Sequence, residues 1–191
     1  NRMIRSWHSV LCSDMAHTHT SESGAVEAVV GCKMTPIPSV HGKISAGALS
    51  AYLTDMGSPH HSQPGLVALT QSTEVATVYT PEEIRAIVDV AHANGLYVHM
   101  DGARIANATV ALGCDVRSFT KDLGVDMMSF GGTKNGMMMA ESVVVFNKDF
   151  VRDFVTLRKQ NLQLASKMRF LAAQYIAYFK DGLWLENARH A

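Results

Sequence analysis

Short apolar runs alternate with stretches of helical periodicity along most of this 191-residue chain. This alternation is typical of βαβ units, in which helices connect the parallel strands of one sheet. It therefore predicts an α/β fold with a mainly parallel sheet. The strands are predicted at residues Ser9–Cys12, Val29–Lys33, Leu66–Thr70, Tyr97–Met100, Asp126–Phe130 and Ser142–Phe146.

The clearest predicted helix covers Pro81–Asn94. Thr80 is a suitable N-cap, Glu83 can complete a capping box, and Gly95 can end the helix. Apolar residues recur inside it at helical spacing. Further helices are predicted over Ile44–Asp55, Arg104–Leu112 and Asp149–Lys180, the last with one break around 161–166.

Composition excludes several function classes. The 17 basic residues balance 17 acidic ones, which argues against a nucleic acid or an anionic membrane as a partner bound through bulk charge. The longest apolar runs are too short to span a bilayer. The three cysteines are widely spaced and odd in number, which predicts a reducing, cytoplasmic location.

Two ionisable residues directly follow predicted strands: Asp101 and Lys134. Ligands of open parallel sheets bind at the carboxyl ends of strands, so we expect both residues, with the segment Gln71–Glu74, in one crevice. An amine that forms a Schiff base and a carboxylate that keeps a pyridine nitrogen protonated are what a pyridoxal-phosphate (PLP) enzyme needs. The structural alternatives are a helix cap for Asp101 and a solvated loop lysine for Lys134.

Arg104 lies three residues after Asp101, at the start of a predicted helix. Its guanidinium could hold an anionic substrate group or an oxygen of the cofactor. The alternative is an ion pair with Asp101 that stabilises the helix start.

Two histidine clusters, His17–His19 and His60–His61, could be metal ligands. No compact set of Cys, His and Asp with zinc spacing accompanies them, so no metal site is predicted. The remaining interpretations are ordinary loop histidines, or one histidine stacked on an aromatic cofactor and another that exchanges a proton with substrate.

Four segments resemble L-threonine aldolases, especially the bacterial low-specificity type, in order, spacing and identity: Thr70–Glu74, Tyr79–Glu83, His99–Ala108 and Ser129–Gly136. The resemblance implies the three-layer αβα large domain of PLP enzymes of fold type I. It also implies PLP-dependent cleavage of L-threonine, L-allo-threonine and other β-hydroxy-α-amino acids to glycine and an aldehyde. A cytoplasmic homo-oligomer, dimer or tetramer, is implied as well.

The resemblance also implies roles for single residues. Lys134 corresponds to the Schiff-base lysine, Asp101 to the partner of the pyridine nitrogen, and His17 to the catalytic histidine stacked over the cofactor ring. Arg104 corresponds to an arginine that binds the substrate carboxylate beside the cofactor. His61 corresponds to the histidine near the substrate hydroxyl, and its neighbour His60 is an alternative for that role.

Two parts of the family pattern are missing from the sequence: the phosphate-binding loop upstream of His17 and a small C-terminal domain. We therefore expect a fragment, with residues 1–160 as a partial PLP-binding large domain and 161–191 as a long helix leading toward the absent domain. PLP binding of full affinity is not expected. The alternatives are another fold-type I reaction (β-elimination, racemisation or transamination) or a truncated, non-catalytic binding module.

Overall fold

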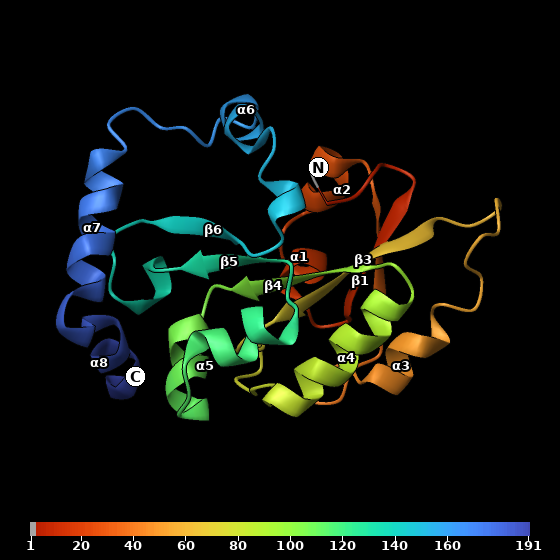
Figure 1. Cartoon of the computed structure of the whole chain (residues 1–191), viewed down its shortest axis with the longest axis horizontal. Helices are drawn as coiled ribbons and strands as arrows, with labels where there is room; N and C mark the ends of the chain where they lie inside the picture. The colour runs from red at the N-terminus through yellow and green to blue at the C-terminus, as the bar shows by residue number, and fades with distance from the viewer. Residues whose placement is uncertain (1–2) are drawn as a thin grey trace.

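The computed structural model of the chain describes residues 3–191, whose strands form a single sheet (Figure 1). The strand order is β2-β1-β3-β4-β5-β6; the first five strands run parallel, and β6 is antiparallel to β5. The predicted mainly parallel α/β sheet is confirmed. The strands are β1 (His8–Ser13), β2 (Lys33–Ile37), β3 (Gln63–Thr70), β4 (Tyr97–Gly102), β5 (Met127–Gly131) and β6 (Glu141–Val145).

Helices cover both faces of the sheet, which gives the three layers (Figure 1). Alternate residues of β1 point to opposite faces, so Leu11 lies in the larger apolar core while Val10 and Cys12 lie in the smaller one. The helices beside the smaller core are α1 (His17–Thr20) and α2 (Ala25–Val30); those beside the larger core are α3 (Ala46–Ala51), α4 (Pro81–Ala93) and α5 (Ile105–Leu112).

Helix α4 confirms the helix predicted from its capping signals. The Thr80 Oγ1 accepts a hydrogen bond from the Glu83 N–H at 3.2 Å, and the Glu83 carboxylate accepts one from the Thr80 N–H at 2.8 Å. Gly95, with a φ of 74°, ends the helix in the left-handed region. The predicted helix over Ile44–Asp55 is shorter in the structure, where it is α3.

The strand predicted over Val29–Lys33 is wrong. Val29 and Val30 belong to α2, which Gly31 ends with a φ of 76°. The strand is β2 instead, and it contains Pro36. A proline cannot donate to a strand partner, but β2 lies at the sheet edge and pairs only with β1, so the missing donor is tolerated there.

Residues 161–191 do not form the single long helix that the sequence predicts. After α6 (Phe154–Gln160), the break expected near 161–166 is present, and α7 (Arg169–Phe179) follows. Asp181 and Gly182, with φ of 53° and 76°, then turn the chain into α8 (Leu183–His190). The 3₁₀ helices of the fold are η1 (Val116–Phe119), η2 (Lys121–Leu123), η3 (Thr133–Asn135), η4 (Lys148–Phe150) and η5 (Lys180–Gly182).

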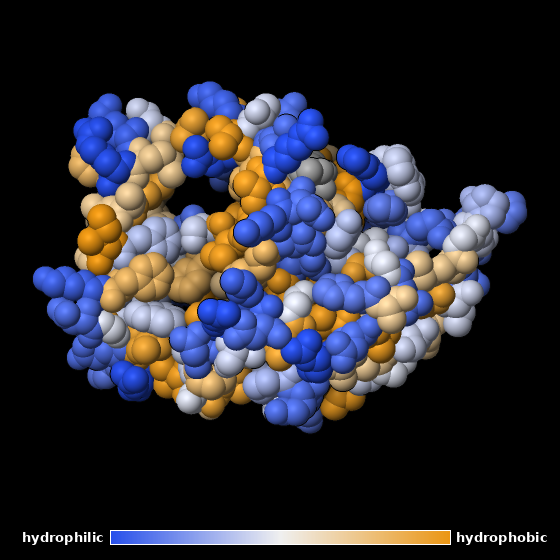
Figure 2. All heavy atoms as spheres, viewed as in Figure 1, coloured by the Kyte–Doolittle hydropathy of each residue, from blue (hydrophilic) through white to orange (hydrophobic). Residues whose placement is uncertain are grey.

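Exposed apolar side chains gather at the end of the molecule formed by β6, α6 and α7, as the hydropathy colouring shows (Figure 2). The exposed fraction reaches 74% for Ile176 and 71% for Val155. The helices α6 and α7 beside β6 therefore present apolar side chains to solvent. Among residues 3–191, no helix combines the length and the apolar character needed to cross a membrane.

Candidate active site

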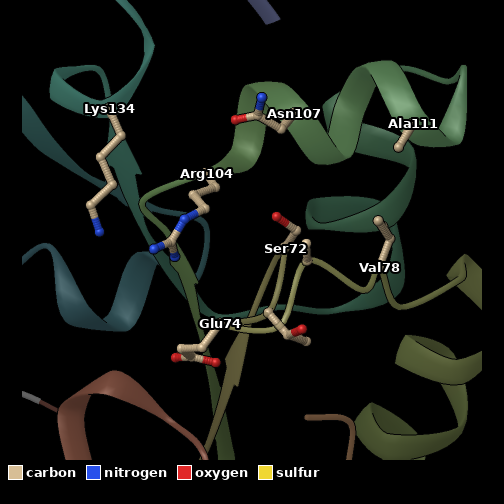
Figure 3. Close-up of a pocket in the computed structure, with 9 residues that line it drawn as sticks. Ser72, Glu74, Val78, Arg104, Asn107, Ala111 and Lys134 are labelled. Atoms are coloured by element: carbon tan, nitrogen blue, oxygen red, sulfur yellow. The ribbon is translucent and has the colours of Figure 1, made fainter. Parts of the chain in front are cut away.

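A pocket of about 370 Å³ opens at the carboxyl edge of the sheet, where β3, β4 and β5 end (Figure 3). Of the residues predicted for one crevice, Lys134 and the segment 72–74 line this pocket, whereas Asp101 is not among its lining residues. Arg104 lines it as well, and Arg104 and Lys134 point into the same opening. Glu74, from the loop after β3, supplies a carboxylate. The other lining residues are Ser72, Thr73, Ala76, Val78, Asn107 and Ala111.

The backbone at Lys134 is rigid although its side chain is exposed. Lys134 lies in η3, and the next residue, Asn135, is buried and hydrogen-bonded to the C-terminal helices. The Asn135 amide donates to the Trp184 carbonyl at 2.8 Å, and the Asn135 carbonyl accepts from Asn187 at 3.0 Å. A Cβ at Gly132 would collide with the side chain of Met137 and lie 3.2 Å from the carbonyl oxygen of Ala140, so a larger residue there would displace its neighbours. The amine is thus presented from a fixed loop.

Asp101 lies near the end of β4, between Thr70 of β3 and Ser129 of β5 in the sheet register. Its Oδ1 accepts hydrogen bonds from the Ala103 N–H at 2.9 Å and from the Ser129 hydroxyl at 3.4 Å. The N-cap of α5 is Arg104, so Asp101 is not the helix cap of the structural alternative. Within residues 3–191 no Asp101–Arg104 ion pair forms.

His99 lies two residues before Asp101 and on the same face of β4. Loss of hydrating water lowers the pKa of the His99 imidazole below its ordinary value of 6.5, and the charge of Asp101 partly opposes this shift. His99 is therefore neutral at pH 7. His99 therefore supplies no positive charge to the Asp101 carboxylate.

Arg104 is half-buried, and its α5 helix carries two more pocket residues. Asn107 and Ala111 follow Arg104 at intervals of three and seven, so the three side chains share one face of the helix. No role is predicted for Asn107 from the sequence, although its spacing from Arg104 on a predicted helix is a usable signal. Asn107 adds an uncharged amide beside the guanidinium.

A hydrogen bond to Glu74, one of the pocket residues, holds His17 near the same edge of the sheet. Its backbone N–H donates to the Glu74 Oε1 at 2.7 Å, which ties the start of α1 to the loop after β3. The imidazole Nδ1 lies 2.8 Å from the Glu22 Oε1. The Glu74 contact fixes the backbone at the start of α1 and the Glu22 contact orients the ring, while His17 is not among the residues that line the pocket.

The structure does not bring His61 to this pocket. His60 and His61 are exposed in the loop before β3, whereas the pocket lies beyond the end of β3. At about 3.3 Å per residue, this strand of eight residues spans roughly 23 Å. The loop projects from the opposite side of the sheet (Figure 1). Within a single copy of the chain, His61 therefore does not lie at the pocket where the histidine near the substrate hydroxyl was expected, because residues before and after β3 lie at opposite ends of that strand.

Across the described residues 3–191, no group of three or more Cys, His, Asp and Glu side chains is arranged to hold a metal ion.

Comparison with known proteins places the whole chain in one group. The family model described as Beta-eliminating lyase matches residues 1–191. The low-specificity L-threonine aldolase of Pseudomonas aeruginosa is 43% identical over 190 residues, which cover 99% of this chain and 55% of the relative. The chain thus spans about half the length of that curated relative.

Solved structures agree with this grouping. The threonine aldolase of Leishmania major superposes with a TM-score of 0.93 at 31% identity, over 99% of this chain and 55% of that one. The PLP-bound C-S lyase of Staphylococcus hominis gives a TM-score of 0.64 at 13% identity, over 96% of this chain and 46% of that one. The latter likeness concerns the fold alone.

Proposed function

Since this chain belongs to the Beta-eliminating lyase family and has the αβα fold of PLP enzymes of fold type I, we propose that it carries the catalytic centre of a PLP-dependent L-threonine aldolase. The proposed reaction is the cleavage of L-threonine, L-allo-threonine and other β-hydroxy-α-amino acids to glycine and an aldehyde. The observation that carries the proposal is the convergence of Lys134 and Arg104 in one pocket, at the edge of the sheet where Asp101 lies near the end of β4.

The polar groups at this edge fit PLP. Lys134 offers an exposed amine on a rigid loop, and the Asp101 carboxylate has no cationic partner among the described residues. When bound, PLP supplies an aldehyde that condenses with amines and a ring that accepts the electrons of a breaking bond. In this account Lys134 binds the aldehyde, and Asp101 keeps the proton on the pyridine nitrogen.

Two further residues have proposed binding roles. His17, fixed by Glu22 and Glu74, covers one face of the cofactor ring. Arg104, which lines the pocket with Lys134, would bind the substrate carboxylate through two parallel N–H donors or contact the cofactor. These roles orient the bond between Cα and Cβ for cleavage.

We also propose a cytoplasmic homo-oligomer. The cysteines Cys12, Cys32 and Cys114 are all free, in keeping with a reducing compartment. His61 lies at the far edge of the sheet from the pocket of its own copy, so any role in binding substrate requires a second copy. We further propose that residues 1–160 are part of the PLP-binding large domain and that 161–191 lead toward a second domain.

β-Elimination is the second candidate, because the matching family model is described as a β-eliminating lyase. Both reactions use Lys134 and Asp101 in the same way, and they differ in the bond that breaks. Elimination from threonine yields ammonia and a 2-oxo acid, whereas aldol cleavage yields glycine and acetaldehyde.

We expect the chain, incubated with excess PLP and L-allo-threonine, to release glycine and acetaldehyde in equal amounts. Amino-acid analysis and an aldehyde-reduction assay measure the two products, and a sample without PLP is the control. Ammonia and 2-oxobutanoate without glycine would establish elimination instead.

A further inference from the structure

One carboxylate oxygen of Glu74 accepts hydrogen bonds from the protein, and the other has no hydrogen-bond partner. Its Oε1 accepts hydrogen bonds from the His17 N–H at 2.7 Å and from the Thr70 hydroxyl at 3.2 Å. Its Oε2 is buried and has no hydrogen-bond partner, the only such side-chain atom found in residues 3–191. A buried acceptor without a donor is unfavourable, and such atoms in native proteins call for an explanation.

Hydrogen bonds hold the loop that carries Glu74, so the loop cannot easily move to give Oε2 a donor. The buried Gln71 side chain makes two hydrogen bonds to the backbone of Tyr79 across the loop. Its amide oxygen accepts from the Tyr79 N–H at 3.0 Å, and its NH₂ group donates to the Tyr79 carbonyl at 2.9 Å. The Thr73 N–H also donates to the Thr77 carbonyl at 2.9 Å. Glu74 is therefore held in place by both its backbone and its Oε1.

Glu74 lines the same pocket as Arg104 and Lys134, and its side chain lies at the margin of that pocket, below the two cationic side chains in the view of Figure 3. Within the described chain it forms no ion pair with either of them. If Arg104 takes the carboxylate of a bound amino acid and the cofactor on Lys134 takes its amine, the group left to meet Glu74 is the substituent on Cβ. A hydroxyl there is a hydrogen-bond donor.

We propose that the Oε2 of Glu74 is the hydrogen-bond and proton acceptor for the β-hydroxyl of the substrate. This inference rests on the proposed function and names the group that selects β-hydroxy amino acids. The hydroxyl proton passes to Oε2, and the O–H electron pair forms the C=O bond of the aldehyde. The Cα–Cβ bond breaks with its electrons left on Cα, which gains a proton to give glycine, so atoms and charge balance.

The substitution Glu74→Gln tests this with little change in shape. Glutamine keeps an oxygen to accept from His17 and Thr70, but it replaces the free Oε2 by an NH₂ donor. Glu82→Gln, on the exposed face at the start of α4, is the matched control. Both variants should unfold thermally at the temperature of the unaltered chain.

The probes are two stable conjugates, phosphopyridoxyl-L-threonine and phosphopyridoxyl-L-2-aminobutyrate, which differ only in the hydroxyl and undergo no cleavage. Their dissociation constants are measured by calorimetry with the PLP-free chain. We expect the chain and Glu82→Gln to prefer the threonine conjugate by about 10- to 100-fold, as for a hydrogen bond to a charged group. Glu74→Gln should lose most of that preference, and with PLP its kcat should fall by about 10²–10⁴-fold.

The outcomes separate the two claims. Equal binding of both conjugates to the unaltered chain, or an undiminished preference in Glu74→Gln, overturns the role of Glu74 while the PLP site and the proposed function stand. Failure of the unaltered chain to bind either conjugate overturns the proposed function and this inference with it.

Discussion

Replacing Lys134 by alanine is expected to abolish the yellow absorbance of the lysine-bound cofactor and to lower glycine release by on the order of 10²–10⁴-fold. The reason is chemical: no other lysine lines the pocket, so no other amine is available there to bind the aldehyde. The absorbance spectrum of the chain with PLP and the rate of glycine release measure the two effects.

Lys148→Ala is the matched control for this prediction. Lys148 is exposed in η4, just after β6, at the opposite edge of the sheet from the pocket. Its removal should leave both the absorbance and the rate unchanged. An unaltered absorbance band in Lys134→Ala would contradict the assignment of Lys134.

Replacing Asp101 by asparagine is expected to preserve the fold but to lower turnover by about 10²–10³-fold, the loss typical of one preorganised electrostatic partner. Asparagine keeps an oxygen that can accept from the Ala103 N–H and the Ser129 hydroxyl. It removes the negative charge that keeps a pyridine nitrogen protonated. Steady-state kinetics with saturating PLP measure the effect.

Asp115→Asn is a suitable control for Asp101→Asn. The Asp115 carboxylate likewise accepts a hydrogen bond from the backbone N–H two residues later, that of Arg117, at 2.7 Å. It caps η1 and is absent from the pocket lining. Near-native turnover in Asp101→Asn, or an equal loss in Asp115→Asn, would count against the proposed role of Asp101.

Local signals explain why much of the fold was predictable. The capping box of α4 depends only on Thr80, Glu83 and their neighbours, so the sequence contains the whole of it. Asp101 and Lys134 were placed correctly at the carboxyl edge because strand direction follows from the βαβ pattern alone. Arg104 and Asn107 share a helix face for the same local reason.

Contacts between distant segments were not predictable. The hydrogen bond between His17 and Glu74 joins residues 57 positions apart, and the support of Asn135 by α8 spans about as many. Neither leaves a pattern in a single sequence. The position of His61 is a different case: it precedes the predicted strand and Gln71–Glu74 follows it, so the sequence already places the two at opposite ends of β3.

The most direct test of the account is to find where PLP attaches. The chain is incubated with limiting PLP and reduced with borohydride, and the labelled peptides are identified by mass spectrometry. The account predicts that Lys134 carries the phosphopyridoxyl group at PLP concentrations at which the exposed Lys121 and Lys148 remain unlabelled. Labelling of all exposed lysines to the same extent, or of another lysine before Lys134, would contradict it.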